Sequence, residues 1–185
     1  MKSLSNPLII LLLAILTVAC SGESDSNVEN SRKSPIAISA VQLGNTYIKV
    51  VYGQPHKRGR EIFGTLVSYG EVWRTGANEA TEITFTEDVE FGGNLVESGI
   101  YSLFTIPEEN QWTVILNKNL GQWGAFSYDD TADYLRFNVP VQTIDEMVES
   151  FTINFSEVEG TQTIMSMVWN STKVEIPIRF IEEDA

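Results

Sequence analysis

Beyond residue 35 the chain consists of short segments in which apolar and polar residues alternate, separated by turn residues. In the segment 82–85, Ile83 and Phe85 face one side of an extended chain and the polar residues beside them face the other. No segment repeats apolar residues at helical spacing over the length that a core helix needs. The predicted strands are 36–41, 46–52, 82–85, 89–91, 95–96, 100–107, 112–116, 134–139, 151–155, 163–169 and 173–178.

This pattern predicts an all-β fold. Many short strands joined by turns rich in glycine, asparagine and proline favour an antiparallel two-sheet β-sandwich, jelly-roll-like in its connections, with at most one short helix. Only Glu61–Val67 fits a short strand and a single helical turn equally well. The stretch of about 150 residues that carries the strands has the usual size of one domain.

The first residues have the pattern of an export signal. Lys2 supplies a positive start, and Leu8–Leu16 is an unbroken apolar run that is too short to span a bilayer core of about 30 Å. Cys20 is the only cysteine, so no disulfide forms within the chain. Its place after Ala19 resembles a bacterial lipoprotein signal, in which the cysteine becomes the lipidated first residue. An ordinary signal with an incidental cysteine is the alternative.

These features divide the chain into three parts. We predict a lipoprotein-type signal peptide over 1–19, a disordered polar tether over 20–35 after the lipidated cysteine, and a single domain over 36–181. The expected location is the bacterial cell envelope, as an outer-membrane or surface lipoprotein or otherwise in the periplasm, held to the membrane through Cys20.

Charge and residue types narrow the chemistry. The formal net charge of −13 argues against a nucleic-acid partner. The domain has a single histidine and no cysteine of its own, so we expect no metal site and no cofactor. The acidic turns at 108–110 and 129–133 do not match a calcium-loop pattern.

The most informative stretch is Trp73–Phe85, where a polar corner leads into an alternating strand. A guanidinium fork binds carboxylates, phosphates or sugar hydroxyls, and aromatic rings form the walls of many small-ligand pockets. We therefore predict a binding site for a small molecule, a glycan or an envelope partner. Its candidate residues are Trp73, Arg74, Asn78, Glu79, Trp123 and Tyr128.

Two other interpretations of this corner stay open. In a purely structural surface domain, Arg74 pairs with Glu79 or Glu82 and the tryptophans belong to the core. In an envelope hydrolase, Glu79 or Glu82 acts as acid or base together with a carboxylate or with His56 from another loop. No catalytic residue is assigned by the sequence.

A basic loop stands out in this acidic chain. It contains His56, Lys57, Arg58 and Arg60. The loop either steers an anion toward the corner or neutralises nearby carboxylates.

Several blocks together resemble the uncharacterised bacterial domain family DUF2911. They are Val50–Pro55, Gly59–Gly64, Trp73–Thr81, Ser98–Pro107, Trp112–Asn117 and Gln122–Ala125, and the likeness spans roughly 36 to 178. The resemblance implies an exported domain, because members commonly carry an export signal, and it implies no activity. Gln54 stands where relatives often have a basic residue.

Overall fold

The computed structural model describes residues 32–181, and this part of the chain is all-β. It contains nine strands, one 3-10 turn and no α-helix, so no helix in it is long and apolar enough to cross a membrane. The elements are β1 (Ile36–Leu43), β2 (Thr46–Gly53), β3 (Thr81–Phe85), β4 (Val89–Phe91), β5 (Asn94–Val96), β6 (Gly99–Pro107), β7 (Gln111–Asn117), η1 (Asp130–Ala132), β8 (Asp133–Phe155) and β9 (Gln162–Phe180). The predicted signal peptide over 1–19 and the predicted lipidation site Cys20 lie outside the described residues.

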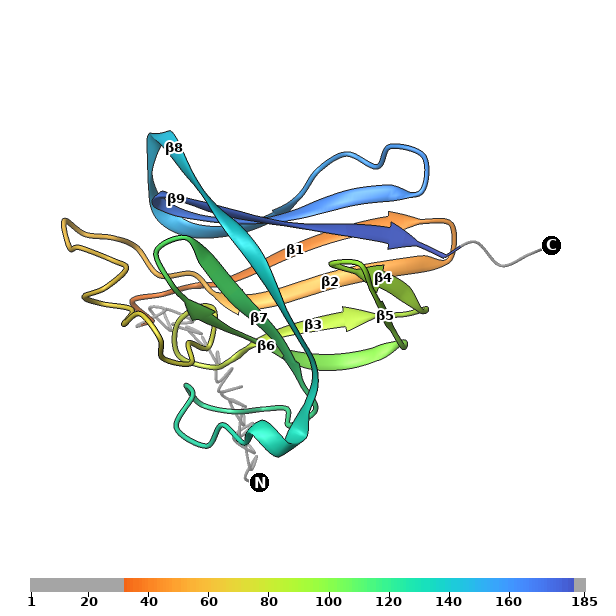
Figure 1. The fold of residues 1–185 in the computed structure, drawn as a ribbon, viewed down its shortest axis with the longest axis horizontal. Coiled ribbons are helices and arrows are strands. Elements are labelled where there is room, and N and C mark those ends of the chain that lie inside the picture. The colour runs from red at the N-terminus through yellow and green to blue at the C-terminus, as the bar shows by residue number, and fades with distance from the viewer. Residues whose placement is uncertain (1–31, 182–185) are drawn as a thin grey trace, which may run out of the picture. The chain divides into compact units, whose positions relative to one another are not determined.

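All nine strands belong to one antiparallel sheet, in the order β1-β2-β3-β6-β7-β8-β9-β4-β5. The expected division into two separate sheets is not confirmed, because β8 joins the two ladders. Its first part pairs with β7 as far as Pro140, and from Val141 onward it pairs with β9. Figure 1 shows β8 crossing the view from beside β7 to beside β9.

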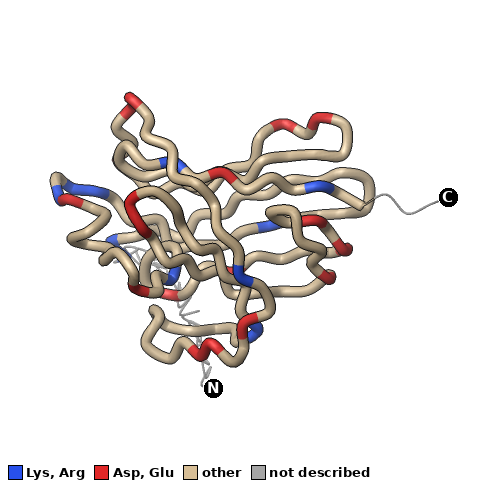
Figure 2. Tube along the Cα trace, viewed as in Figure 1, with Lys and Arg blue, Asp and Glu red and all other residues tan. Residues whose placement is uncertain are grey.

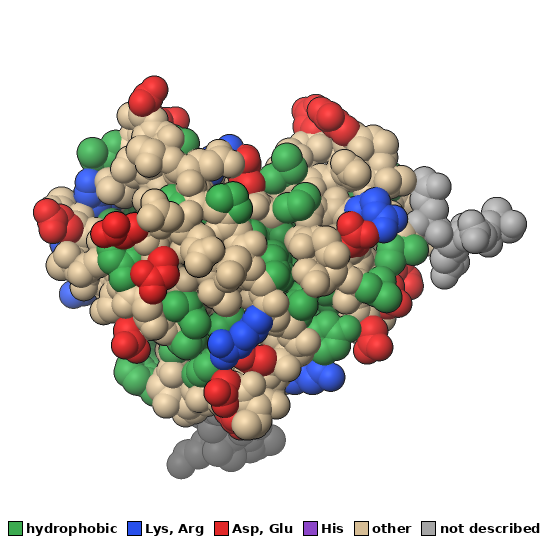
Figure 3. Space-filling model, viewed as in Figure 1, with side chains coloured by type: hydrophobic (Ala, Val, Ile, Leu, Met, Phe, Trp, Pro, Cys, Tyr) green, Lys and Arg blue, Asp and Glu red, His purple; other side chains and the backbone are tan. Residues whose placement is uncertain are grey.

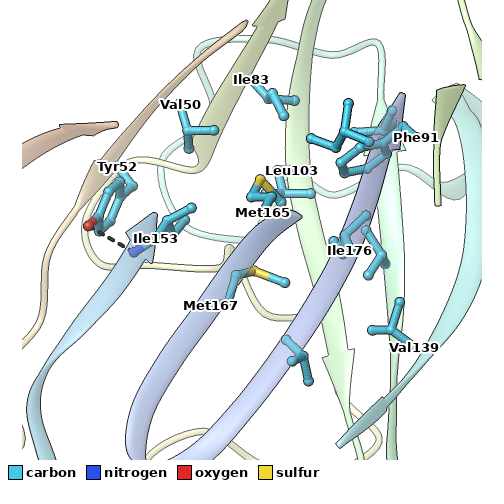
Figure 4. Packing of buried hydrophobic residues seen from close by; sticks show 14 of the residues in the cluster. Val50, Tyr52, Ile83, Phe91, Leu103, Val139, Ile153, Met165, Met167 and Ile176 are labelled. Atoms are coloured by element: carbon cyan, nitrogen blue, oxygen red, sulfur yellow. Dashed lines mark hydrogen bonds between the residues drawn. The ribbon is translucent and has the colours of Figure 1, made fainter. Parts of the chain in front are cut away.

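The core forms because alternate residues of distant strands face each other. Val50 of β2, Ile83 of β3 and Leu103 of β6 belong to the same buried cluster as Met165 and Met167 of β9. Figure 4 shows these side chains pointing toward one another. The two-residue period of the sequence therefore predicts the buried face of β2 and β3. The central strands β6 and β7 are buried on both faces, because Phe104 and Ile115 form a second small cluster with Ala80.

One buried hydroxyl ties the two ladders together within this core. The Tyr52 side chain of β2 accepts a hydrogen bond of 3.0 Å from the Ile153 amide of β8. Burial is the main cause that raises the pKa of Tyr52, so the hydroxyl stays protonated at neutral pH. The dashed line in Figure 4 marks this bond.

Charged side chains are spread over the surface of the domain. Figure 2 shows acidic residues on many loops and strand ends, with Lys and Arg between them. Acidic, basic and apolar side chains are also interspersed on the face drawn in Figure 3. This distribution indicates no single extended field of one sign on that face.

Replacing the buried Phe151 of β8 tests the core. Phe151 is 0% exposed and packs edge-on against Tyr52, with ring centroids 5.8 Å apart. Phe151→Ala is expected to lower the free energy of unfolding by about 3–5 kcal/mol, because it removes buried surface and leaves a cavity. The matched control is Phe126→Ala, at an 87% exposed position, which should change it by less than about 0.5 kcal/mol in urea titrations. Similar losses for both variants would contradict this core.

Candidate functional site

The corner begins where the chain runs beside β6. Trp73 and Thr105 exchange two backbone hydrogen bonds, of 2.7 and 2.9 Å. The corner closes when the Thr81 amide donates to the Arg74 carbonyl and the Thr81 hydroxyl donates to the Thr75 carbonyl. Backbone bonds at both ends therefore hold the segment 74–80 as a fixed turn.

The turn is also pressed against the end of β2. The Ala77 amide donates a 3.0 Å hydrogen bond to the Gly53 carbonyl. A Cβ atom on Gly53 would lie 1.9 Å from the Ala77 carbonyl oxygen. Glycine is required at this position because two backbones approach more closely than any side chain allows.

Trp73 is part of the core and does not line a surface site. It is 7% exposed, and its indole N–H donates a 3.0 Å hydrogen bond to the Gly76 carbonyl. Its ring packs against Phe151 at 4.9 Å and stacks on Trp169 at 6.1 Å. The predicted aromatic wall therefore lacks Trp73, because the ring points into the domain.

Glu79 is paired with an arginine from the start of the described chain. Both of its carboxylate oxygens accept hydrogen bonds from the Arg32 guanidinium, one of them at 2.8 Å. The hydrogen bond from Arg32 is the main cause that lowers the pKa of Glu79. The side-chain amide of Asn78 donates to the Ser34 carbonyl at 3.4 Å. Arg32 and Ser34, placed in the tether by the sequence, thus contact the corner.

Arg74 has no such partner within residues 32–181. Its guanidinium makes no hydrogen bond or ion pair with another described residue, and its buried Nε has no acceptor. Burial alone lowers the pKa of Arg74. The expected pairing with Glu79 or Glu82 is not found, since Glu79 holds Arg32 and Glu82 accepts a 3.0 Å bond from the Gly121 amide.

Three buried side-chain polar atoms in the described part of the chain lack a partner, and all three belong to residues of the corner or bonded to it. They are Arg32 Nε, Arg74 Nε and Gln122 Oε1. Arg32 pairs with Glu79, and the Gln122 carbonyl accepts a 2.8 Å hydrogen bond from the Ala80 amide. Because buried polar groups are nearly always hydrogen-bonded, these three atoms set the corner and its neighbours apart from the rest of residues 32–181.

The two remaining aromatic candidates differ in position. Trp123 is 61% exposed and its backbone bridges to Glu79, so this residue lies beside the corner with its side chain largely open to solvent. Tyr128 packs on Phe104, and its hydroxyl donates a 2.7 Å hydrogen bond to Asp133. Burial is the first cause that raises the pKa of Tyr128, so this side chain acts as a neutral structural donor.

The basic loop is largely engaged with the protein itself. His56 Nδ1 lies 2.7 Å from the Ser150 hydroxyl, and Arg60 donates to two carbonyls of its own loop. Arg58 donates a 2.6 Å hydrogen bond to the carbonyl of Lys33. Through the Arg58 side chain the loop therefore contacts the segment 32–34, whose Arg32 and Ser34 also bind the corner.

The residues named in the hydrolase interpretation are engaged by other groups, since Glu82 accepts a hydrogen bond from the Gly121 amide. Glu79 is neutralised by Arg32, and His56 contacts Ser150 rather than a carboxylate. No group of three or more His, Cys, Asp or Glu within residues 32–181 is arranged to hold a metal ion.

Two hollows lie elsewhere on the domain. One of about 700 Å³ is lined by residues at several strand ends, namely Leu43, Gly44, Asn45, Thr46, Glu87, Asp88, Gly160, Phe180 and Ile181. The other, of about 500 Å³, is lined by Tyr69 and Glu108, Glu109, Asn110 and Gln111. Neither includes a residue of the corner.

Two features of the site are not indicated by any local pattern. Nothing in the sequence predicts that Arg32, rather than Lys33, contacts Glu79, because this contact joins residues 47 positions apart. The sequence also does not predict that the side-chain amide oxygen of Gln122 is buried. A signal for Trp73 does exist: neighbours on an extended segment face opposite sides, so Trp73 and Arg74 cannot both line one surface.

The fold and the corner define an antiparallel all-β domain whose polar turn is joined to its own N-terminal segment. The chain belongs to DUF2911, described as a protein family of unknown function, whose profile matches residues 34–178. No curated protein and no solved structure matches the chain.

The Arg32–Glu79 pair predicts a pH-dependent contribution to stability. Because the folded-state pKa of Glu79 is lowered, the pair stabilises the protein above the unfolded-state pKa of about 4.3 and this stabilisation is lost as the pH falls through the folded value. Urea titrations from pH 7 to pH 3 should show wild type more stable than Glu79→Gln at pH 7, with the difference shrinking below about pH 4.

The control is the same substitution made in an Arg32→Gln background. Without its guanidinium partner, Glu79→Gln should no longer alter the pH dependence of unfolding. An unchanged pH dependence in both backgrounds would show that the pair does not set the pKa of Glu79.

Proposed function

We propose that this protein is an exported, lipid-anchored and non-enzymatic binding domain that takes an acidic or oxygen-rich ligand at Arg74. The ligand class comprises small molecules, glycans and envelope components that carry carboxylate, phosphate or clustered hydroxyl groups. The observation that carries the proposal is the partly buried Arg74 guanidinium, whose Nε has no acceptor.

The energetic argument concerns a cation held out of water. Removing an ionised group from water is costly unless a partner of opposite charge or several hydrogen bonds compensate. Glu79, the nearest carboxylate along the turn, is already bound by Arg32 and is not available to Arg74. An incoming carboxylate or phosphate would supply this compensation through the planar fork of the guanidinium.

The fixed backbone of the turn adds to the argument. A binding group is effective when its position is set before the ligand arrives, because less ordering entropy is then lost on binding. The carbonyl of Arg74 is hydrogen-bonded to Thr81, and the preceding Trp73 is held on both sides by Thr105. The guanidinium thus extends from a rigid base.

A ligand screen by thermal shift tests this function. Wild type and Arg74→Ala are compared over a panel of citrate, inorganic phosphate, sulfate and uronic-acid oligosaccharides. A ligand at a hundred times its Kd should stabilise wild type by about 2.7 kcal/mol and leave Arg74→Ala unshifted. The control is Arg179→Ala, whose guanidinium pairs with Glu90 far from the corner along the chain and which should respond like wild type.

The same position separates binding from a purely structural role. If Arg74 serves a ligand, Arg74→Met should cost no stability in the ligand-free protein, because it removes an uncompensated cation and keeps much of the apolar stem. A structural role predicts a clear loss of stability. Binding that survives unchanged in Arg74→Ala would remove the corner from consideration.

We also propose that Cys20 carries the lipid anchor. The support is the signal-like N-terminal pattern of the sequence, since Cys20 lies outside the described residues. Two acyl chains hold a protein stably on a membrane, whereas a single chain is marginal.

Labelling tests the anchor. Cells fed a labelled fatty acid should yield labelled wild-type protein in the detergent phase of a phase-separation assay, and Cys20→Ser should carry no label. Ser24→Ala, a change close to the cysteine, should behave like wild type. If wild type carries no label and partitions like Cys20→Ser, the lipid anchor is contradicted. The N-terminal pattern would then be an ordinary export signal with an incidental cysteine.

A further inference from the structure

Three large apolar side chains are exposed on the loop that is hydrogen-bonded to the corner. In the segment Leu120–Phe126, here called the apolar loop, Leu120 is 46% exposed, Trp123 61% and Phe126 87%. We propose that the apolar loop inserts into the interfacial region of a bilayer and docks the domain on the membrane that carries its anchor. The proposal rests on the lipid anchor of the proposed function, and it assigns the exposed Trp123 ring to lipid rather than to the ligand of Arg74.

The loop holds these side chains on a fixed backbone. The Ala80 amide donates to the Gln122 carbonyl at 2.8 Å, and the Gly124 amide donates to the Asn78 carbonyl at 2.8 Å. Gly124 has a φ of +72°, and a Cβ atom there would lie 2.8 Å from the Phe126 ring. The Phe126 ring therefore lies against the Gly124 backbone. Its exposure is a feature of a loop held by hydrogen bonds.

The position of the first described residues favours the membrane as the partner of the apolar loop. Arg32 is hydrogen-bonded to Glu79, and the Glu79 backbone bridges to Trp123. The apolar loop is thus next to the first described residue. Cys20 precedes Arg32 by twelve residues, which span at most about 40 Å when fully extended. A lipidated Cys20 keeps this edge of the domain within reach of the bilayer surface.

The chemistry of the loop also favours lipid over a second copy of the chain. Tryptophan and phenylalanine are the side chains that partition into membrane interfaces. Three side chains on one loop provide much less than the roughly 800 Å² per partner that a stable protein interface buries. The same connection carries the exposed Asp129 and Asp130, so docking should prefer zwitterionic to anionic lipid.

Tryptophan fluorescence tests the proposal on the full chain, because the protein has four tryptophans and only one is exposed. Trp73, Trp112 and Trp169 are at most 7% exposed, so an aqueous or lipid-borne quencher reports on Trp123. Protein reconstituted into phosphatidylcholine vesicles with brominated acyl chains should show a quenched, blue-shifted component. Its quenching by iodide should fall several-fold relative to protein without vesicles.

Two variants make the signal specific. Trp123→Phe keeps an aromatic ring at the interface and removes the reporter, so the component quenched by bromine should disappear. Leu120→Ser combined with Phe126→Ser keeps the reporter and weakens insertion, so quenching by bromine should drop several-fold with no change in Tm. Arg74→Ala should leave the quenching unchanged, which separates docking from ligand binding.

The outcomes that overturn the proposal are distinct from failure of the anchor. Protein that floats with the vesicles while Trp123 stays open to iodide and unquenched by bromine would overturn docking and leave the anchor standing. Bromine quenching of a chain that carries no fatty-acid label would support docking without the anchor. If the chain carries no fatty-acid label and Trp123 is not quenched by bromine, docking is overturned. Concentration-dependent protection of Trp123 without lipid would overturn it in favour of self-association.

Discussion

The backbone pair between Trp73 and Thr105 is the interaction on which the site depends. Its two hydrogen bonds place the chain beside β6, so that successive residues face opposite sides. The Trp73 ring enters the core and packs with Phe151 and Trp169. Arg74, the next residue, is thereby directed away from that ring cluster. The packing of Trp73 thus fixes Arg74 in a partly buried position, where desolvation of the guanidinium is unfavourable.

Electrostatics at the corner are divided between two arginines. Arg32 is neutralised by Glu79, whereas Arg74 is partly desolvated and unpaired among the described residues. If the corner were only a structural turn, the simplest arrangement would pair Arg74 with the carboxylate on its own turn. The pairing of Glu79 with Arg32 leaves the Arg74 cation without a counter-charge in the described part of the chain, which is the feature behind the proposed binding role.

The alternation of apolar and polar residues was sufficient to predict the all-β class, most of the strands, and the buried face of β2 and β3. It could not predict that β8 continues from one ladder into the next, because alternation reveals faces and not neighbours. Nor could it place Arg32 on Glu79, a contact that depends on how the sheet folds. The alternation also could not predict that Trp73 is buried and Trp123 exposed, because both lie beside turn residues in the sequence.

The Arg32–Glu79 contact also has a mechanical meaning. A chain held at one end by a membrane and at the other by its own fold carries any force that acts on the domain. With the proposed anchor at Cys20, such a pull would reach Arg32, which is paired with Glu79, and Ser34, which accepts a hydrogen bond from Asn78, before it reached Ile36, the first residue of the β1–β2 ladder. In an anchored chain the ion pair would therefore bear this load before the edge strand β1 does.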